Sequence, residues 1–386
     1  MSVLMGALAP RDAQFADGFV ALDAPRGVHV VTVGAATYVV NAGEGDDGIT
    51  FWELGADGSL TEFASFFDPS LLALAGASNF ASATVGGATY LYVNGYRDDG
   101  ITVSLVEEGS ITVGVDVVVD DGTLAIGGPF GRMAVAQVGD DAFLVASGYD
   151  DSGFSVFRIA ADGTLSATDT VLRGGGADLA FPVDVAAATV EGRSFAFVAA
   201  YSDDAINVFE IDGSGGATLV GAVTDASDPA LELRGAWGVA TAMVGGVTYV
   251  VVTGSDDQGV SVFSVDGAGT LSNVFNLSDG TLPLLGPLSV TAFEVDGETF
   301  LSVGAYLSNA LNVLHLGAGG VLTDVTAAFD TAATGLRGAY DSAFATVGGV
   351  PLLVATGFQE DAITTFEVGG DDDALRGGGA ADTILG

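Results

Sequence analysis

The sequence predicts an all-β protein in which seven copies of one four-stranded antiparallel unit close into a ring. A strand with apolar residues on both faces recurs at intervals of 51–54 residues. The seven copies of this strand open at Ile49, Ile101, Phe154, Ile206, Val260, Leu311 and Ile363. A hairpin dipeptide such as Gly245-Gly246 also occurs once per copy, because glycine tolerates the positive φ of tight turns. This regular pattern is typical of a seven-bladed β-propeller.

The strands of each copy follow in a fixed order. The first ends at the hairpin and carries small residues such as Ala134 and Ala186, as expected where blades converge on a central axis. The second follows the hairpin, and the third is the recurring strand. In that strand Ile206 and Phe209 lie on opposite faces, so both faces are predicted to be buried between neighbouring blades. The fourth follows a second turn, as at residues 273–277.

The seventh copy lacks a fourth strand of its own. A spare apolar stretch, Val3 to Leu8, precedes the first copy. We expect this N-terminal strand to complete the last blade and close the ring, because closure removes an exposed sheet edge. Residues 1–368 then form the propeller, and residues 369–386 form a separate tail.

The composition excludes some partners. Ten arginines, no lysine and 50 acidic residues give a net charge of −40. Such a surface repels nucleic acid and anionic lipid, and it suits a salty or calcium-rich medium. Acidity that only keeps the protein soluble is the alternative. Since the chain has no cysteine, thiol catalysis is excluded.

One uncharged stretch, Gly235 to Ser255, is long enough to raise the question of a membrane span. Gly245-Gly246 divides it into two short strands, so we interpret it as a buried hairpin and expect no membrane insertion. The first ten residues lack the basic segment and long apolar run of a signal peptide. We expect a monomeric propeller.

An acidic pair precedes the third strand in six copies, and Ser308-Asn309 replaces it in the sixth. The pairs are Asp46-Asp47, Asp98-Asp99, Asp150-Asp151, Asp203-Asp204, Asp256-Asp257 and Glu360-Asp361. A carboxylate ring on this face could bind cations or a polyhydroxylated ligand. The Ser-Asn replacement favours turn capping instead, because Asp, Asn and Ser side chains all accept hydrogen bonds from nearby backbone N–H groups.

The entry of each first strand is the best candidate for a ligand site. Arginines and aromatic residues gather there, near the axis and on the face of the acidic turns. The predicted ligand-binding residues are Arg26, His29, Arg132, Asp184, Arg234, Trp237, Arg337 and Tyr340. The positions equivalent to Arg132 and Asp184 in other copies are Asn79, Ser289 and Asp341. Salt bridges between the arginines and the acidic turns are the alternative interpretation.

The tail contains two nonapeptides, residues 368–376 and 377–385. They resemble the RTX (haemolysin-type) calcium-binding repeat, Gly-Gly-x-Gly-x-Asp-x-apolar-x. The resemblance implies calcium ligands at Asp373 and Asp382, together with glycine-turn carbonyls. It also implies an extracellular or cell-surface protein released by type I secretion from a Gram-negative bacterium. A flexible Gly/Asp tail is the alternative.

The sequence motif Ile-x-Val-Phe-x-Ile, followed by Asp-Gly-Thr-Leu, resembles that of seven-bladed lactonases of the 6-phosphogluconolactonase type. The best match is at residues 155–165. The shared residues build blades, and many non-enzymatic propellers have them. Lactone hydrolysis would need a base and a cationic clamp, and only His29 with Arg26, Arg132 or Arg337 offers them.

Three functions therefore remain open. We favour a secreted, calcium-associated binding or adhesion module whose ligand, a polysaccharide or another cell-surface component, binds at the channel mouth. A lactonase-like hydrolase and a structural spacer are the alternatives.

Overall fold

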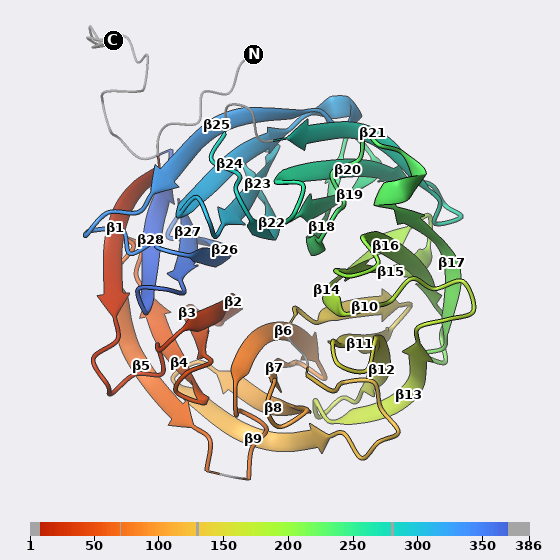
Figure 1. Cartoon of the computed structure of the whole chain (residues 1–386). Helices are drawn as coiled ribbons and strands as arrows, with labels where there is room; N and C mark the ends of the chain where they lie inside the picture. Colours follow the sequence, from red (N-terminus) through yellow and green to blue (C-terminus); the bar gives the residue numbers. More distant parts are fainter. Residues whose placement is uncertain (1–7, 70, 129–130, 279–281, 370–386) are drawn as a thin grey trace, which may run out of the picture.

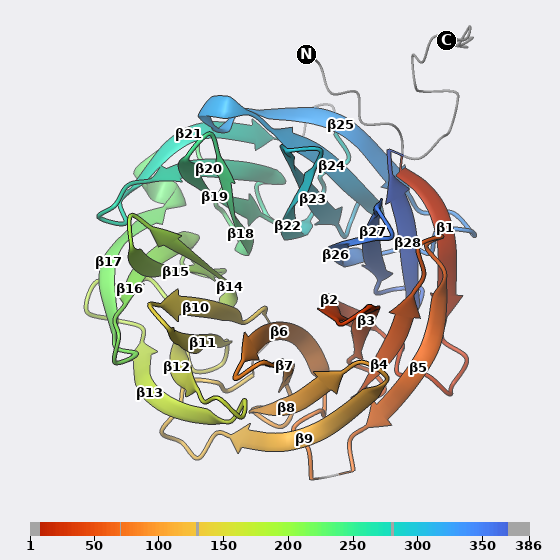
Figure 2. The same ribbon diagram turned by 180° about the vertical axis from the view of Figure 1, so that it is seen from behind.

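The structure is a computed structural model that describes residues 8–69, 71–128, 131–278 and 282–369. These residues form seven four-stranded antiparallel sheets arranged in a ring around a central axis, which confirms the predicted propeller (Figures 1 and 2). Within them, two short 3₁₀ turns, η1 (Asp225–Ser227) and η2 (Ala318–Gly320), are the only helical elements. None of the described residues belongs to a helix long and apolar enough to cross a membrane.

The strands of each blade run from the channel to the rim. The innermost strands of blades one to seven are β2 (Pro25–Val33), β6 (Ala77–Val85), β10 (Ala134–Val138), β14 (Pro182–Val190), β18 (Ala236–Val244), β22 (Pro287–Val295) and β26 (Ala339–Val347). The second strands are β3 (Ala36–Gly43), β7 (Ala88–Gly95), β11 (Asp141–Gly148), β15 (Arg193–Ala200), β19 (Val247–Gly254), β23 (Glu298–Ala305) and β27 (Val350–Gly357). The hairpin of β18 and β19 confirms the interpretation of the long uncharged stretch.

The third strands are β4 (Gly48–Leu54), β8 (Gly100–Glu107), β12 (Gly153–Ile159), β16 (Ala205–Ile211), β20 (Gly259–Val265), β24 (Ala310–Leu316) and β28 (Ala362–Val368). The outermost strands are β5 (Leu60–Phe67), β9 (Ser110–Val119), β13 (Leu165–Leu172), β17 (Ala217–Thr224), β21 (Leu271–Ser278), β25 (Leu322–Phe329) and, in blade seven, β1 (Leu8–Phe15).

An N-terminal strand closes the ring, as predicted, and it extends further along the chain than expected. Strand β1 pairs with β28 from Leu8 opposite Val368 to Phe15 opposite Ala362. Of the predicted Val3 to Leu8, only Leu8 belongs to the described residues. The described strand continues past the predicted stretch to Phe15, and its sequence is a mixture of buried, partly buried and exposed residues.

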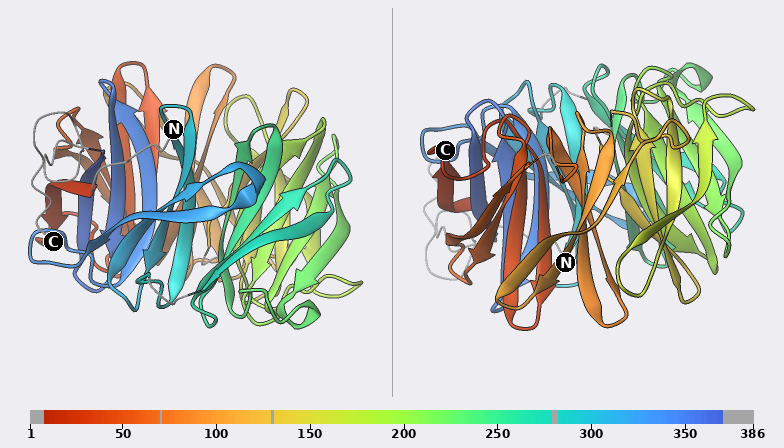
Figure 3. Two further views of the ribbon diagram at one scale, coloured as in Figure 1. Left: turned by 90° about the horizontal axis from the view of Figure 1, so that it is seen from above. Right: turned by 90° about the horizontal axis from the view of Figure 1, so that it is seen from below.

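The core consists of apolar clusters between adjacent blades, which pack face to face around the ring (Figure 3). Ile206 and Val208 belong to the cluster that blade four shares with blade five. Phe209 and Ile211 belong to the cluster shared with blade three. All four side chains are buried, which confirms that the recurring strand has two buried faces.

A buried polar residue anchors the loop that enters each blade. It lies two residues after the glycine or alanine that opens the third strand. In blades one to seven these residues are Thr50, Thr102, Ser155, Asn207, Ser261, Asn312 and Thr364. Thr50 Oγ1, for example, accepts a hydrogen bond from the backbone N–H of Ala21 at 2.8 Å. These bonds fix the loops that surround the channel entrance.

Candidate ligand site at the channel mouth

The entry loops and the acidic turns lie at the same end of the channel, which we call the mouth. Here each blade contributes one residue, in or just before its innermost strand, to a neck ring defined by equivalent positions in the seven repeats. Its members are Gly27, Asn79, Arg132, Asp184, Gly238, Ser289 and Asp341. Strand pairing shifts register at this level, between Pro182 and Asp184 and between Ala339 and Ser342. Such bulges re-aim side chains, here close to the axis.

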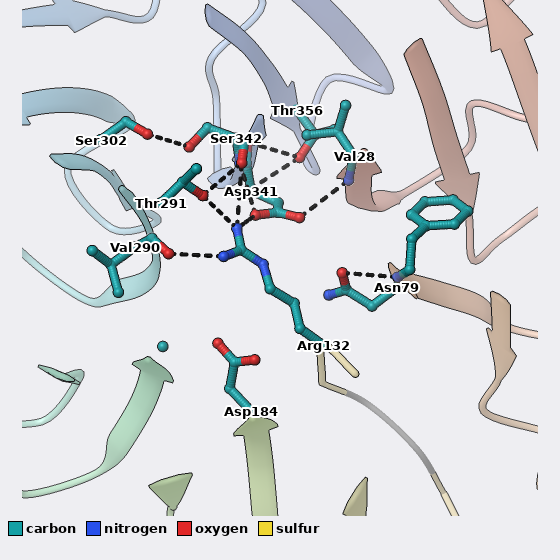
Figure 4. A network of polar contacts seen from close by, with 12 residues as sticks. Val28, Asn79, Arg132, Asp184, Val290, Thr291, Ser302, Asp341, Ser342 and Thr356 are labelled. Carbon is teal, nitrogen blue, oxygen red and sulfur yellow. Dashed lines mark hydrogen bonds and ion pairs between the residues drawn. The ribbon is translucent and has the colours of Figure 1, made fainter. Parts of the chain in front are cut away.

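Arg132 extends across the channel from blade three to blades six and seven (Figure 4). Its guanidinium forms an ion pair with Asp341, which is 2% exposed. It also donates hydrogen bonds to the Val290 carbonyl at 2.7 Å and to Thr291 Oγ1 at 2.8 Å. Arg132 is therefore bound to its own protein and forms a bar across the channel.

The two aspartates of the neck ring connect neighbouring blades. Asp341 Oδ2 accepts a hydrogen bond from the backbone N–H of Val28 at 3.1 Å. Asp184 Oδ2 accepts one in the same way from Val239 at 3.0 Å, and its Oδ1 accepts one from Val185 at 2.8 Å. Asp184 has no ion-pair partner in the described chain. Burial raises its pKa to about 7, although Arg132 and the two backbone donors favour the charged form.

Ser289 is the unsatisfied member of the ring. It is 5% exposed, and its Oγ has no hydrogen-bond partner among the described residues. It borders a cavity of about 20 Å³, together with Asn79, Arg132, Asp184, Trp237, Tyr340 and Asp341 among others. This volume suffices for one water molecule or one ligand hydroxyl group. Buried hydroxyl groups rarely lack a hydrogen-bond partner, so the cavity is suited to a polar group of a ligand.

Beyond the bar, on the hairpin side, the channel widens into a cavity of about 510 Å³. His29 lies in its wall, where its Nε2 is 2.9 Å from Ser82 Oγ in the next blade. Burial, assisted by the charge of Arg132, lowers the pKa of His29 to about 4, so its ring is neutral at pH 7. The residues lining the cavity are Val28, His29, Val30, Asn79, Phe80, Ala81, Ser82, Arg132, Met133, Val135, Thr291, Ala292, Phe293, Ser342, Ala343 and Phe344.

The other predicted arginines lie further out at the mouth. Arg26 forms an ion pair with Glu44 and donates to the Tyr340 hydroxyl at 2.8 Å. Arg234 is exposed, lies 3.5 Å from an Asp257 carboxylate oxygen, and donates to the Asp256 carbonyl at 2.8 Å. Acidic residues thus pair with Arg26, Arg132 and Arg234. These pairs leave the three arginines poorly suited to bind an anionic ligand.

Arg337, in the loop before β26, is exposed, and its charge only partly offsets the rise in the pKa of Glu360 that burial and Asp330 cause. It does not contact the neck ring in the described structure. Asp373 and Asp382, the predicted calcium ligands, lie outside the described residues. Within these residues, no group of three or more His, Asp or Glu side chains is placed to hold a metal ion.

An aromatic belt surrounds the mouth, and sequence reasoning missed most of it. The belt occupies the position five residues before the apolar residue that opens the recurring strand. A partly exposed aromatic side chain stands there in five of the seven repeats. These residues are Tyr96, Tyr149, Tyr201, Tyr306 and Phe358. Tyr201 packs edge-to-face on Trp237, with ring centroids 5.3 Å apart, and Tyr306 does so on Tyr340 at 6.2 Å. The constant spacing in the sequence is the signal that would have revealed the belt.

The acidic turns hold the entry loops. Asp203 Oδ2 accepts from the N–H of Ala180 in its own blade's entry loop at 2.8 Å. The next residue, Asp204, has φ 49° and accepts from Gly235 in the following blade's loop at 2.7 Å. Ser308 and Asn309 make equivalent bonds in blade six. The turns therefore cap loops of two blades, rather than only their own turn.

The acidic pairs do not occupy the same turn positions in every blade. In blades three and five the two turn positions are Asp151-Ser152 and Asp257-Gln258, one residue later than the acidic pair. Ser152 and Gln258 have φ of 52° and 62°, the left-handed conformation that marks the second turn position. The positions of acidic residues in the sequence therefore do not give the register of these turns, which the backbone conformation shows.

The fold and the neck ring define a seven-bladed β-propeller with a candidate ligand site at one end of its central channel. No family model and no curated protein matches the sequence. Solved propellers do match the structure. A catalytically inactive virginiamycin B lyase from Staphylococcus aureus has a TM-score of 0.58 and 12% identity, and the match covers 92% of this chain and 99% of that one.

Two lactonase structures are also similar. The periplasmic gluconolactonase of Pseudomonas aeruginosa has a TM-score of 0.59 and 22% identity, with 78% of this chain and 84% of that chain covered. A putative 6-phosphogluconolactonase from Bacteroides uniformis has a TM-score of 0.58 and 16% identity, with 78% and 88% covered. At these identities the similarity shows the fold, and the resemblance to lactonase propellers is confirmed at that level.

Proposed function

We propose that this propeller is a binding module that takes an uncharged, polyhydroxylated ligand, such as the end of a polysaccharide or another surface glycan, at its channel mouth. The observation that carries the proposal is the unpaired, buried hydroxyl of Ser289 in a polar cavity beside Trp237 and Tyr340. Aromatic rings offer flat apolar surface to a sugar ring, while carboxylate, amide and hydroxyl groups hold its hydroxyls.

The charges at the mouth favour an uncharged ligand. A protein of net charge −40 repels anionic polymers at long range. Arg26 and Arg132, which could have attracted a carboxylate locally, are engaged by Glu44 and Asp341. Asp184, in contrast, has both carboxylate oxygens at the neck and can exchange hydrogen bonds with hydroxyl groups.

A glycan array tests this proposal, followed by calorimetry with any glycan that binds. Trp237→Ala should weaken binding at least about tenfold, because aromatic anchors dominate such interfaces. Met243→Ala, an exposed position in the first strand of blade five near the hairpin end, is the matched control and should bind like wild type. Absence of glycan binding by the folded protein would contradict the proposal.

We also propose that the tail binds calcium and that the protein is exported by type I secretion. The support is the pair of RTX-like nonapeptides with Asp373 and Asp382 at the ligand positions. Calorimetric titration of the chelator-treated protein with millimolar calcium should release or absorb heat that is lost in the Asp373→Asn/Asp382→Asn double variant. Identical traces from the two proteins would count against the calcium proposal.

A second candidate is hydrolysis of a lactone in the channel. Asp184 favours it, because a carboxyl group with a pKa near 7 is suited to general acid–base chemistry. His29 is a poor base here, since burial and, to a smaller extent, the charge of Arg132 disfavour its protonated form. Turnover of glucono-δ-lactone, followed with a pH indicator, should be lost in Asp184→Asn and kept in the exposed hairpin variant Asp140→Asn. A folded wild-type protein without turnover would exclude this substrate.

A further inference from the structure

The cavity on the hairpin side of the Arg132 bar is separate from the mouth. Its volume of about 510 Å³ lies within the range of small-molecule sites. Arg132 and Asp341 cross the channel between the two spaces, and both side chains are held by the protein. A ligand in this cavity therefore does not need the aromatic belt or the Ser289 hydroxyl.

The wall of the cavity is mostly apolar. Valine, alanine, methionine and phenylalanine side chains supply most of the lining. Phe293 stacks on Phe344, with ring centroids 4.7 Å apart and planes inclined by 22°. Phe293 stands where the inner strands of five other blades carry alanine, so one side of the channel has an aromatic wall. Apolar surface of this kind gains free energy when a ligand displaces its water.

The wall of the cavity also contains a polar pair, His29 and Ser82. Their side chains are joined by the 2.9 Å contact between Nε2 and Oγ. The second ring nitrogen of His29, Nδ1, has no hydrogen-bond partner in the described part of the chain, so it can serve a ligand. Thr291, by comparison, already accepts from Arg132 and donates to the Ser342 carbonyl.

A histidine–serine pair is also the arrangement of a nucleophile and its base. The charge distribution argues against that use here. Burial and the charge of Arg132 both disfavour a positive imidazole, which the transfer of the serine proton to His29 would create. No carboxylate in the described structure hydrogen-bonds to His29 Nδ1 to compensate. The pair is therefore better suited to bind than to react.

Charge also limits the class of ligand. The acidic surface repels anions, and a cation would lose its hydration without an unpaired carboxylate in the wall to replace it. We propose that this cavity is a second ligand site, for a small, uncharged and largely apolar molecule whose single hydroxyl or carbonyl group hydrogen-bonds to His29.

Calorimetry and intrinsic fluorescence with 1-naphthol and naphthalene test this proposal, because the two probes differ only in one hydroxyl group. Wild type should bind one 1-naphthol, more tightly than naphthalene. His29→Leu should reduce that preference about three- to tenfold, the effect of one neutral hydrogen bond. Ala343→Phe, which fills space in the wall, should weaken both probes at least about tenfold. Circular dichroism melts establish that each variant is folded.

Trp237→Ala is the control for the mouth and should leave both affinities unchanged. Two results would overturn the inference. One is the absence of saturable 1-naphthol binding by the folded wild type. The other is binding that Trp237→Ala abolishes while His29→Leu and Ala343→Phe leave it intact, since the probe would then occupy the mouth. Glycan binding uses the mouth alone. A protein that binds no glycan could therefore still bind 1-naphthol in this cavity, and the two proposals are tested independently.

Discussion

The buried carboxyl group of Asp184 should make the stability of the propeller depend on pH. Its pKa is about 7 in the folded protein, against an ordinary value of 3.8. The folded state therefore binds the proton more tightly than the unfolded chain does. The resulting stabilisation is complete below pH 3.8 and is lost as pH rises through 7.

The magnitude follows from the two pKa values. Between pH 8 and pH 5 the folded protein takes up nearly one proton at Asp184 that the unfolded chain does not. With 1.36 kcal/mol per pH unit, this change adds about 2.5 kcal/mol to the free energy of unfolding. For a chain of 386 residues it corresponds to a rise of about 3 °C in the melting temperature.

The assay is a series of thermal melts from pH 5 to pH 8 on wild type and on Asp184→Asn. Other carboxyl groups titrate in both proteins, so the difference between the two pH dependences isolates Asp184. The asparagine variant should lack the 3 °C rise on acidification, even if it melts lower overall because Val239 loses its acceptor. Asp140→Asn should retain the rise. Parallel pH dependences of wild type and Asp184→Asn would show that Asp184 remains ionised when folded, and would refute the reasoning.

Three further predictions concern stability. Deleting residues 1–15 removes β1, opens the ring and should lower the melting temperature by roughly 10 °C or more; an unchanged melt would contradict the closure. Arg132→Met leaves the buried Asp341 without its partner and should cost about 3–5 kcal/mol, read as a fall of about 4–6 °C. Thr50→Val keeps the side-chain shape but deprives the Ala21 N–H of its acceptor, and chemical denaturation should show a loss of about 1–3 kcal/mol.

Matched variants distinguish these effects from general damage. Arg173→Met removes an exposed ion pair with Asp203 and should barely change the melt, because solvent screens such pairs. If Arg132→Met melts like Arg173→Met, the bar across the channel contributes little to stability. Thr61→Val, on the exposed outer strand of blade one, is the corresponding control for Thr50→Val.

The sequence allowed the blades to be predicted because their pattern is local and repeated seven times. Apolar residues on both faces of residues 206–211 require a neighbour on each side, and this requirement alone indicates a blade. The ring closure was predicted, but not the extension of the strand to Phe15, because an outer strand such as β1 needs little apolar character. The register of the acidic turns could not be read from residue type, because Ser152 and Gln258 occupy the left-handed turn position in two blades.

The candidate site was predictable only in part. Comparison of equivalent positions in the repeats pointed to Arg132 and Asp184 at the neck. Residues that differ between otherwise similar repeats are not needed to build the blades that all repeats share. Which aspartate pairs with Arg132 depends on the span of the ring, and no repeat pattern contains that information. The contact between His29 and Ser82 joins two blades across positions that are not equivalent, so the alignment of repeats could not reveal it.

The pairing of β1 with β28 has a consequence for how the propeller could be presented to a partner. Leu8 and Val368 lie side by side at the hairpin end of blade seven, opposite the mouth. Anything fused to either end of the described chain is therefore tethered on the side away from the aromatic belt. An anchor or a cargo attached there would leave the mouth pointing outward, so both ends are equally suitable attachment points when the module is immobilised for binding experiments.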